Sequence, residues 1–302
     1  MERMVFEDVR AFSPRHIFEC GQAFRWNADG DGYTGVAGGV AAKVGFVPDA
    51  GGREGGSVVV SGDNLEGAED GEGRRGRGFW EHYLDLGRDY TAVNEALSEG
   101  DEAMARAVAF GEGIRILNQD PWESLISFIV SQNSHIPRIK GCIESLCLRF
   151  GGAVGAFGGR EYRAFPGVEA LAGLSEGDLA PCRLGYRAGY IVGAAGQVAA
   201  RGGMRFLASL RGADLDEAER ALLSLCGVGP KVAACVLLFG LGRTECFPVD
   251  VWVGRAMGAL YGIDGNDRKA VLKYARARFG AHAGIAQQYI FHYMRNAAGA
   301  RA

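Results

Sequence analysis

The spacing of apolar residues changes near residue 79, and this change predicts two regions of different secondary structure. Between residues 16 and 61, apolar and polar positions alternate in short runs that Asp-Gly pairs separate. Alternation with a period of two is typical of strands that bury one face. We therefore expect a small antiparallel sheet, whose runs are Phe24 with Trp26, 33–36, 40–46 and 58–60.

From residue 79 almost to the end, apolar residues recur at helical spacing. Asp120, Pro121 and Glu123 supply an N-cap, a first-turn proline and an acidic N3 residue for one helix. A second helix is predicted from Ile136 to the glycines at 151–152, and a polar junction, Ser-Gln-Asn-Ser-His at 131–135, separates the two. Further helices are predicted at 186–200, 251–261, 268–279 and 284–296.

A helix, a tight glycine hairpin and a second helix are predicted around 225–231. Asp214 caps the first helix, in which leucines recur at helical spacing. Gly227 and Gly229 then allow positive φ, and Pro230 fits the first turn of the second helix. Without Cβ atoms in the way, the backbone N–H groups of the hairpin can contact an anion, for which a DNA phosphate is the natural candidate.

Lys231, at the start of that second helix, and Asp250, after a glycine-containing turn, form a candidate chemical pair. Burial at a helix N-terminus disfavours the charged form of a lysine, and the neutral amine is a nucleophile. A carboxylate aimed into the same cavity could take up a proton or stabilise a cationic sugar. Taken singly, Lys231 could equally be a solvated or phosphate-contacting lysine, and Asp250 could be a simple N-cap.

These patterns predict an α+β protein with two domains. We expect an N-terminal antiparallel sheet domain over residues 1–112 and a mostly helical, two-lobed domain over residues 113–302. A polar, glycine-rich zone near 49–78 interrupts the first domain. Its composition buries little apolar surface, so we expect a mobile insert around the 58–60 strand. Its arginines at 73–78 could contact a nucleic-acid backbone, although a plain disordered insertion is favoured.

Charge is distributed unevenly along the 302 residues, although the net charge is only −3. Residues 1–110 carry 11 Lys and Arg against 20 Asp and Glu, whereas residues 111–302 carry 22 against 16. The second region is therefore the basic one, as expected of a surface that binds phosphates.

Several classes of protein are excluded by motifs that the sequence lacks. None of the seven cysteines has C-x-x-C spacing, so neither a zinc site nor a redox site is indicated. No cysteine follows Cys246, which excludes a C-terminal four-cysteine iron-sulfur loop. The sequence also lacks a P-loop and a Gly-x-Ser-x-Gly elbow. No apolar run approaches the ~20 residues needed to span a bilayer, and no signal peptide is recognisable.

The hairpin and its flanks resemble a known superfamily. Gly-Val-Gly-Pro-Lys at 227–231, an apolar helix and Phe-Pro-Val-Asp at 247–250 are similar to the helix-hairpin-helix, Gly/Pro-Asp (HhH-GPD) DNA glycosylases, whose members with a lysine here are bifunctional. Further segments resemble one branch, the 8-oxoguanine DNA glycosylases with lyase activity. They are 20–26, 119–133 with 136–138, 184–187 and 286–291, and the resemblance omits only the glycine-rich zone.

The resemblance implies a base-binding pocket beside the catalytic residues Lys231 and Asp250. In it, the carbonyl of Gly21 would accept from the N7–H that distinguishes 8-oxoguanine from guanine. Phe291 and Cys235 would lie on the two faces of an extruded base, and Gln287 would bind its pairing edge. Trp252, which we count with the base-binding residues, stands where the better-known eukaryotic relatives have a histidine.

The resemblance also implies a DNA-binding surface. Asn133 would fill the gap that the extruded nucleotide leaves, and Ser134-His135 replaces the asparagine-rich continuation of the relatives. Arg138 and Arg187 would contact the orphaned cytosine, with Tyr186 wedged beside it. Gly227 and Gly229 of the hairpin complete the predicted DNA contacts.

We therefore expect a monomeric, intracellular base-excision repair enzyme, nuclear in a eukaryote and in the cytoplasm or nucleoid of a prokaryote. It would act on duplex DNA containing 8-oxoguanine, need no cofactor or metal, and bind no membrane. Lys231 would displace the base, and the resulting Schiff base would permit β-elimination. The alternatives are a monofunctional glycosylase for alkylated bases and, from a different class, a non-catalytic HhH module that only binds DNA.

Overall fold

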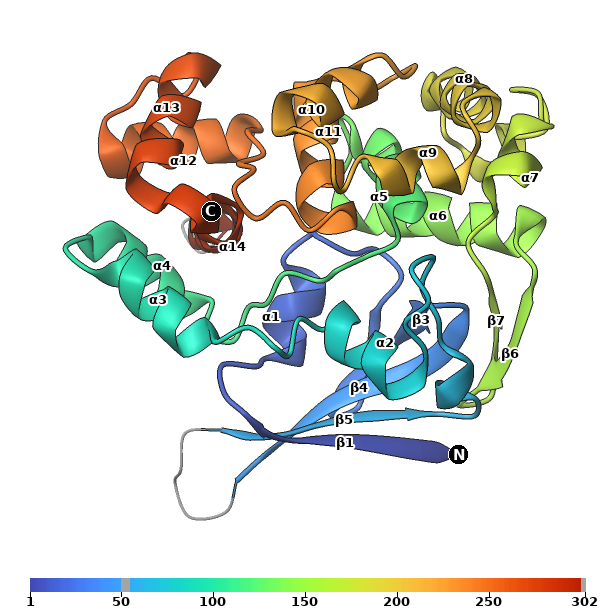
Figure 1. The fold of residues 1–302 in the computed structure, drawn as a ribbon, viewed down its shortest axis with the longest axis horizontal. Coiled ribbons are helices and arrows are strands. Elements are labelled where there is room, and N and C mark those ends of the chain that lie inside the picture. The colour runs from blue at the N-terminus through green and yellow to red at the C-terminus, as the bar shows by residue number, and fades with distance from the viewer. Residues whose placement is uncertain (50–54, 300–302) are drawn as a thin grey trace.

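The computed structural model describes residues 1–49 and 55–299 and shows an α+β fold, as expected. Its N-terminal part is a five-stranded antiparallel sheet in the order β1-β5-β4-β3-β2. Most of the helices lie on one side of this sheet (Figure 1). The strands are β1 (Glu2–Val9), β2 (Asn27–Asp29), β3 (Gly32–Ala37), β4 (Val40–Pro48) and β5 (Gly56–Gly62).

Three of the four predicted strand runs coincide with strands β3, β4 and β5, whereas strands β1 and β2 were not predicted. Two further segments of the sheet domain also differ from the prediction. Residues 14–19 form a short helix, α1 (Pro14–Glu19), capped by Ser13, whose side chain accepts from the N–H of His16. Phe24 and Trp26 lie outside the strands, in a buried connection between α1 and β2. The strand predicted there was wrong because both side chains are buried by packing against neighbouring elements, which periodicity cannot distinguish from a pleated face.

The glycine-rich zone 49–78 is only partly described. Residues 50–54 of the predicted mobile insert lie outside the described residues. After β5, the chain forms a 3-10 turn, η1 (Leu65–Gly67), a bridge between Glu69 and Arg75, and the start of helix α2 (Gly76–Tyr83). Backbone N–H groups of Glu72 and Arg74 donate to the Asp70 carboxylate, which organises the intervening turn.

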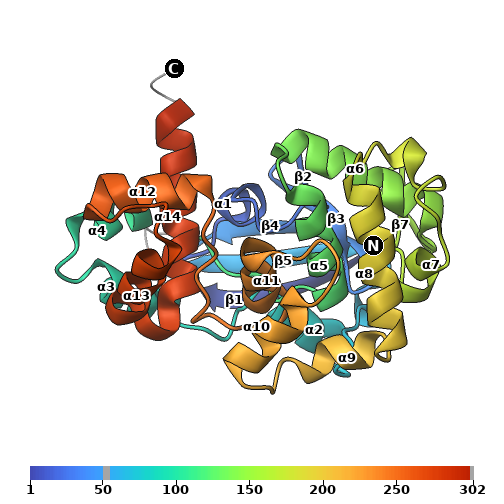
Figure 2. The same cartoon turned by 90° about the horizontal axis from the view of Figure 1, so that it is seen from above.

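Two apolar cores underlie the two predicted domains. The first contains Phe18, Trp26, Val44 and Trp80 between the sheet, α1 and α2. The second lies among the helices. Helices α3 (Tyr90–Ser98) and α4 (Glu102–Phe110) precede the predicted boundary at 112, yet their buried side chains belong to this second core. In Figures 1 and 2 these two helices lie beside the C-terminal helix α14 (Ala283–Gly299).

The helical region agrees closely with its predicted elements. Asp120 accepts from the N–H of Glu123, as expected of a cap, and α5 (Pro121–Ser131) ends at the polar junction. The remaining helices are α6 (Ile136–Phe150), α7 (Val168–Ala172), η2 (Ala180–Cys182), α8 (Arg187–Ala200), α9 (Met204–Ser209), α10 (Leu215–Leu223), α11 (Pro230–Cys235), the π-turn η3 (Val236–Gly240), α12 (Val251–Tyr261), α13 (Arg268–Phe279) and η4 (Gly280–His282).

A second, two-stranded sheet was not predicted. It pairs β6 (Ala153–Phe157) with β7 (Arg160–Arg163) around the turn Gly158-Gly159. Phe157 packs with Val36 and Ala41 of the main sheet, so this hairpin connects the helical region to the sheet. Viewed from above, α10 and α11 lie between the lobe of α12–α14 and the lobe of α6–α8 (Figure 2).

Candidate active site

The predicted glycine hairpin joins α10 to α11, and its two glycines have different conformations. Gly227 has a φ of +74°, and a Cβ there would approach Tyr190 Cβ to 2.4 Å, so both conformation and space require glycine. Gly229 has an ordinary φ of −96°, so of the two glycines only Gly227 uses the positive φ that glycine allows. A Cβ at Gly229 would meet nothing within 4 Å. Glycine therefore leaves the N-cap of α11 open to an approaching group.

Lys231 is the second residue of α11 and points toward the last turn of α5. Its Nζ donates to Ser131 Oγ at 3.1 Å and lies 4.8 Å from the ring centroid of Phe128. Lys231 forms no ion pair with any carboxylate among the described residues. The amine is therefore half-buried without an opposite charge fixed against it.

Asp250 is the N-cap of α12, and its Oδ1 accepts from the N–H of Val253 at 2.8 Å. Asp250 therefore caps α12, as one of the two interpretations predicted, and its carboxylate also remains at the site. Asp250 and Lys231 line the same small pocket. Cys235, one helical turn after Lys231, lines it too, and burial raises the pKa of its thiol to about 11 although the nearby Lys231 lowers it. Cys235 is therefore a neutral thiol at physiological pH.

The pocket brings together most of the predicted catalytic and base-binding residues. Its free volume is about 40 Å³, which is less than a purine needs, so entry of a base requires the walls to separate. Gln287 is 5% exposed, and its Oε1 has no hydrogen-bond partner among the described residues. A buried carbonyl oxygen without a donor is costly, and a ligand that donates to it would remove that cost. The lining residues are Gly21, Phe128, Lys231, Cys235, Phe239, Pro248, Asp250, Gln287, Gln288 and Phe291.

Gly21 reaches this pocket from the sheet domain because its segment is fixed on both sides. Gln288 of α14 donates to the carbonyl of Cys20 at 2.7 Å, and the side chain of Gln22 donates to the carbonyl of Arg115 at 2.8 Å. Gly21 has a φ of +87°, and a Cβ there would lie 3.3 Å from Phe291 Cε1. Only glycine fits this position without displacing the aromatic wall of the pocket.

Trp252 is not among the residues that line the pocket. It lies in the first turn of α12 and is 37% exposed, and the guanidinium of Arg255 lies 5.6 Å from its ring centroid. Its aromatic ring therefore faces outward beside the site. The structure does not bring it to the other predicted base-binding residues.

The predicted DNA-binding residues lie around the junction between α5 and α6. Asn133 is exposed and has a φ of +46°, so the chain turns sharply there. Arg138, in the first turn of α6, is also exposed. Tyr186 is 53% exposed and packs edge-to-face against Tyr190, whose side chain lies against Gly227. These side chains are exposed and therefore available to a ligand.

Arg187 differs from the other predicted DNA-binding residues because it is only 6% exposed. Its Nε donates to the carbonyl of Gln132 at 2.8 Å, its Nη1 to that of Leu184 at 3.1 Å and its Nη2 to that of Asn133 at 3.0 Å. The guanidinium thus supports the Asn133 loop from beneath. Direct contact with a base requires some of these donors to be released.

Several contact residues of the site were not identified from the sequence, among them Phe128, Phe239 and Gln288. Ser131 lay in the predicted polar junction at 131–135 but was not predicted to contact Lys231. The available signal was spacing, because Phe128 and Ser131 are three residues apart and so share a face of α5. Their contact with Lys231 could not be read from the sequence, because α11 comes about a hundred residues later in the chain.

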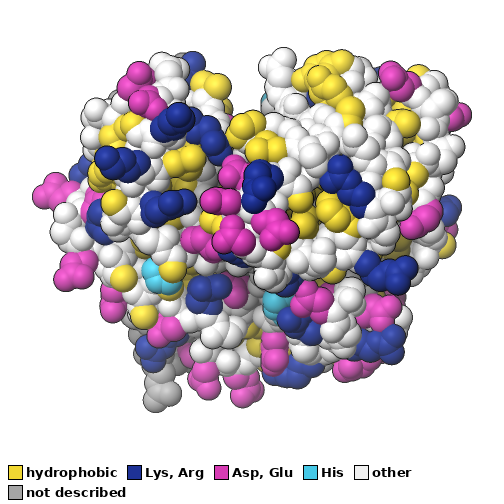
Figure 3. Space-filling model, turned by 45° about the horizontal axis from the view of Figure 1, so that its top comes forward, with side chains coloured by type: hydrophobic (Ala, Val, Ile, Leu, Met, Phe, Trp, Pro, Cys, Tyr) yellow, Lys and Arg dark blue, Asp and Glu magenta, His cyan; other side chains and the backbone are white. Residues whose placement is uncertain are grey.

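Charge on the surface around the site follows the uneven distribution seen in the sequence. In Figure 3, Lys and Arg side chains gather over the lobe that contains α12 and α13, and acidic side chains gather nearer the middle of that face. Lys269, Lys273 and Arg276 of α13 are exposed. Within the described ranges, no group of three or more His, Cys, Asp or Glu side chains is placed to hold a metal ion, and no helix is long and apolar enough to cross a membrane.

Comparison with known proteins agrees with this architecture. Residues 4–125 match the family "8-oxoguanine DNA glycosylase, N-terminal domain", and residues 126–280 match the "HhH-GPD superfamily base excision DNA repair protein" family. A probable N-glycosylase/DNA lyase of Methanothermobacter thermautotrophicus is 36% identical over 216 residues, which are 65% of this chain and 68% of that protein.

Solved structures extend the similarity to nearly the whole chain. The structure of MBOgg1 with a low-affinity DNA ligand has a TM-score of 0.87 and 37% identity, and the match covers 98% of this chain and 96% of that one. The Clostridium acetobutylicum 8-oxoguanine glycosylase/lyase bound to double-stranded DNA, with cytosine opposite 8-oxoguanine, has a TM-score of 0.83 and 33% identity over 99% of both chains. The chain therefore belongs to the 8-oxoguanine DNA glycosylases of the HhH-GPD superfamily.

Proposed function

We propose that Lys231 is the nucleophile of this bifunctional DNA glycosylase and lyase, which removes 8-oxoguanine from duplex DNA. The neutral amine attacks C1′ of the extruded nucleoside, the bond from C1′ to the base breaks, and the base leaves with its electron pair. The resulting Schiff base allows β-elimination of the 3′ phosphate. The observation that carries this proposal is that Lys231, without a carboxylate fixed against it, shares one pocket with Asp250 and an unpartnered Gln287.

Asp250 is proposed to stabilise positive charge on the sugar as the base departs. Its capping bond to Val253 occupies one carboxylate oxygen and holds the side chain at the pocket. A preorganised carboxylate in a pocket with little water interacts strongly with a developing cation. Asp250 also provides a site to which a proton can be transferred while the Schiff base forms.

Recognition of the base is proposed to use residues from both domains. Gln287 Oε1 lacks a donor, so an N–H on the pairing edge of the base would satisfy it. Gly21 lines the same pocket, where its carbonyl would accept from the N7–H of 8-oxoguanine. Phe291 and Cys235 would enclose the two faces of the base once the pocket walls separate. Trp252, which lies beside the pocket, would act at its rim.

Contacts with the duplex are proposed to come from the junction and the hairpin. Asn133 would occupy the space of the extruded nucleotide, with Tyr186 beside it. Arg138 is exposed and would contact the orphaned cytosine directly, whereas Arg187 would share or release a backbone bond to do so. The open N-cap at Gly229 and the carbonyl-bonded Gly227 would place the hairpin against the DNA backbone. We infer that a monomer suffices, because every proposed group lies on one chain.

Borohydride trapping tests the assignment of the nucleophile. Incubation with 8-oxoguanine duplex and borohydride should yield a covalent protein–DNA adduct, and Lys231→Gln should abolish it while the protein still binds DNA. Lys43→Gln provides a matched control, since Lys43 pairs with Asp31 in the sheet domain. A trapped adduct that persists in Lys231→Gln would refute the role of Lys231.

Substrate choice separates this proposal from its alternatives. Duplexes with 8-oxoguanine, an alkylated base or no lesion should be compared side by side for base release and strand cleavage. A monofunctional alkylated-base glycosylase would release the alkylated base without forming an adduct. A DNA-binding module would leave all three duplexes intact. We expect base release and strand cleavage only with 8-oxoguanine.

A further inference from the structure

Among the described residues outside its own helix, the amine of Lys231 contacts the last turn of α5. Ser131 Oγ accepts from Lys231 Nζ at 3.1 Å, and the Phe128 ring centroid lies 4.8 Å from the same nitrogen. Phe128 and Ser131 are three residues apart on α5 and so present one surface to the amine. The surroundings of Nζ therefore combine an aromatic face with a single hydroxyl.

The Ser131 hydroxyl has a backbone acceptor for its proton in this arrangement. A hydroxyl carries one proton, and Ser131 donates it to the carbonyl of Phe128 at 2.8 Å. Toward Lys231 it therefore presents a lone pair and accepts an N–H. An amine that donates one N–H in a fixed direction has its own lone pair confined to the remaining directions. Ser131 thus restricts where the nucleophilic electron pair can point.

The turn that carries Ser131 is itself fixed on two sides. Gln132 Nε2 donates to the carbonyl of Gly227 at 2.8 Å, which ties the end of α5 to the hairpin just before α11. The buried guanidinium of Arg187 bonds to the backbone carbonyls of Gln132 and Asn133. These bonds therefore tie the turn that bears the hydroxyl acceptor to the hairpin that precedes α11.

We propose that Ser131 is a positioning residue, which orients the Lys231 amine for attack on C1′ without touching the DNA. The inference rests on the proposed role of Lys231 as nucleophile. Because an effect through Lys231 does not depend on the base, Ser131 should matter equally for an 8-oxoguanine site and for an abasic site that is already formed. Asn133 lies two residues further on, so insertion of Asn133 into a duplex would act on the same turn that holds the amine.

The test uses the full chain and two DNA substrates. Single-turnover rates of borohydride trapping are measured on 8-oxoguanine duplex and on duplex with a preformed abasic site, and affinity is measured with a non-cleavable abasic analogue. Ser131→Ala should slow trapping about tenfold on both substrates, since orientation of reacting groups accelerates attack, while affinity changes less than about twofold. Ser131→Thr, which retains the hydroxyl, should recover most of the rate.

Two further variants keep the experiment decisive. Ser124→Ala is the matched control, because Ser124 lies on the same helix with a buried hydroxyl that has no partner among the described residues. It should leave both rates unchanged. If Ser131→Ala folds poorly, Ser131→Cys preserves the size of the side chain but supplies only a weak acceptor, and it should show the same tenfold loss.

The possible results have separate meanings. Wild-type rates for Ser131→Ala or Ser131→Cys, or slowing on the 8-oxoguanine duplex alone, would overturn the positioning role. Slowing that Ser131→Thr fails to rescue would also overturn it, because the loss would then follow packing rather than the hydroxyl. Trapping that persists in Lys231→Gln would instead overturn the proposed function. The two failures are therefore distinguishable.

Discussion

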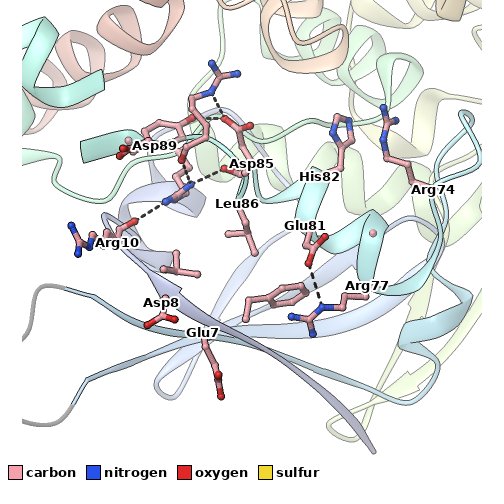
Figure 4. Close-up of a pocket in the computed structure, with 17 residues that line it drawn as sticks. Glu7, Asp8, Arg10, Arg74, Arg77, Glu81, His82, Asp85, Leu86 and Asp89 are labelled. Carbon is pink, nitrogen blue, oxygen red and sulfur yellow. Dashed lines mark hydrogen bonds and ion pairs between the residues drawn. The ribbon is translucent and has the colours of Figure 1, made fainter. Parts of the chain in front are cut away.

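A large cavity near the sheet domain and the candidate active site differ in how their polar groups are satisfied. The large cavity, of about 760 Å³, lies among β1, α2 and the start of α3, whereas the active-site pocket is far smaller. Figure 4 shows the large cavity lined with charged side chains, among them Glu7, Arg77, Glu81 and Asp85. A search for the active site by cavity size and charge alone would therefore select the large cavity and not the pocket that contains Lys231.

Charged groups in the large cavity mostly bond to one another or to the backbone. Arg77 pairs with Glu81 at 3.3 Å, and Arg88 pairs with Asp85 at 2.7 Å. Arg115 is 2% exposed and donates to the carbonyls of Ala11, Asp85, Arg88 and Arg10. The active-site pocket instead contains a lysine without an ion pair and a buried amide oxygen without a donor. Unmet bonding capacity, rather than volume, distinguishes the site where a ligand is needed.

Among the substitutions that test this difference between the two cavities, removal of the Asp250 charge should have the largest effect, a slower rate of base excision. Asp250→Asn keeps an N-cap side chain for α12 but loses the negative charge in the pocket. We expect base excision to slow at least about a hundredfold, which is about 2.7 kcal/mol, with little change in the melting temperature. Asp267→Asn, the same change at the N-cap of α13, should leave the single-turnover rate unaffected. Equal rates for the two variants would contradict the proposed role.

Arg115→Met, in the large cavity, should lower the stability of the protein without slowing base excision. The substitution leaves four backbone carbonyls without their donor, so we expect the free energy of unfolding to fall by about 3 kcal/mol. Urea denaturation measures this, and Arg106→Met, at an exposed pair with Glu102, is the control. The excision rate of the folded enzyme should not change. If the folded Arg115→Met variant excised the base more slowly than the wild type, the large cavity would have a functional role.

Gln287 and Gln288 are adjacent on α14, and they allow an unpartnered amide to be compared with a hydrogen-bonded one within a single helix. Gln287→Ala removes the unpartnered amide and should slow 8-oxoguanine excision about tenfold, about 1.4 kcal/mol, while cleavage of a preformed abasic site is unchanged. Gln288→Ala removes the bond to the Cys20 carbonyl and should lower stability by about 1–2 kcal/mol. Gln287→Ala that loses stability instead of rate would show that both glutamines are structural.

His82, in the large cavity, should give the smallest effect, and only as a dependence on pH. Burial, together with Arg74 and Arg211, lowers the pKa of His82 in the folded protein. The unfolded chain therefore binds a proton more readily as the pH falls below about 6.5, so His82 reduces stability in that range. His82→Gln should flatten the pH dependence of urea denaturation between pH 7 and pH 5. An unchanged slope would mean that His82 does not titrate differently on folding.

Prediction from sequence succeeded where local signals determine structure. The caps at Asp120 and Asp250, the first-turn prolines and the periodic apolar faces placed α5, α6, α12 and α13 correctly, because these features act within one or two turns. The hairpin β6–β7 was missed although Gly158-Gly159 is a turn signal, since the burial of Phe157 depends on contact with Val36 and Ala41 of the distant main sheet. Helix α1 was missed although Ser13-Pro14 is a start signal, because its neighbours alternate like a strand.

The contents of the site were predictable, but the contacts among them were not. Residue types and the resemblance named Lys231, Asp250, Gly21 and Gln287, which the structure brings to one pocket. The outward position of Trp252 and the buried guanidinium of Arg187 depend on the packing of α8 and α12 against other segments. No local pattern records such packing. Pairs of residues about a hundred positions apart, such as Ser131 and Lys231, become apparent only in three dimensions.

The packing of α3 and α4 against α14 limits how this protein can be divided. Tyr289 of α14 donates to Asn94 Oδ1 of α3 at 2.8 Å, and Arg278 donates to the carbonyl of Leu97 at 3.0 Å. A fragment beginning at residue 113 would leave one side of α14 bare, although the sequence boundary suggests a separable module. Exchange of the helical part between homologous genes must therefore carry residues 90–110 along with it, or the hybrid would lack part of its interior.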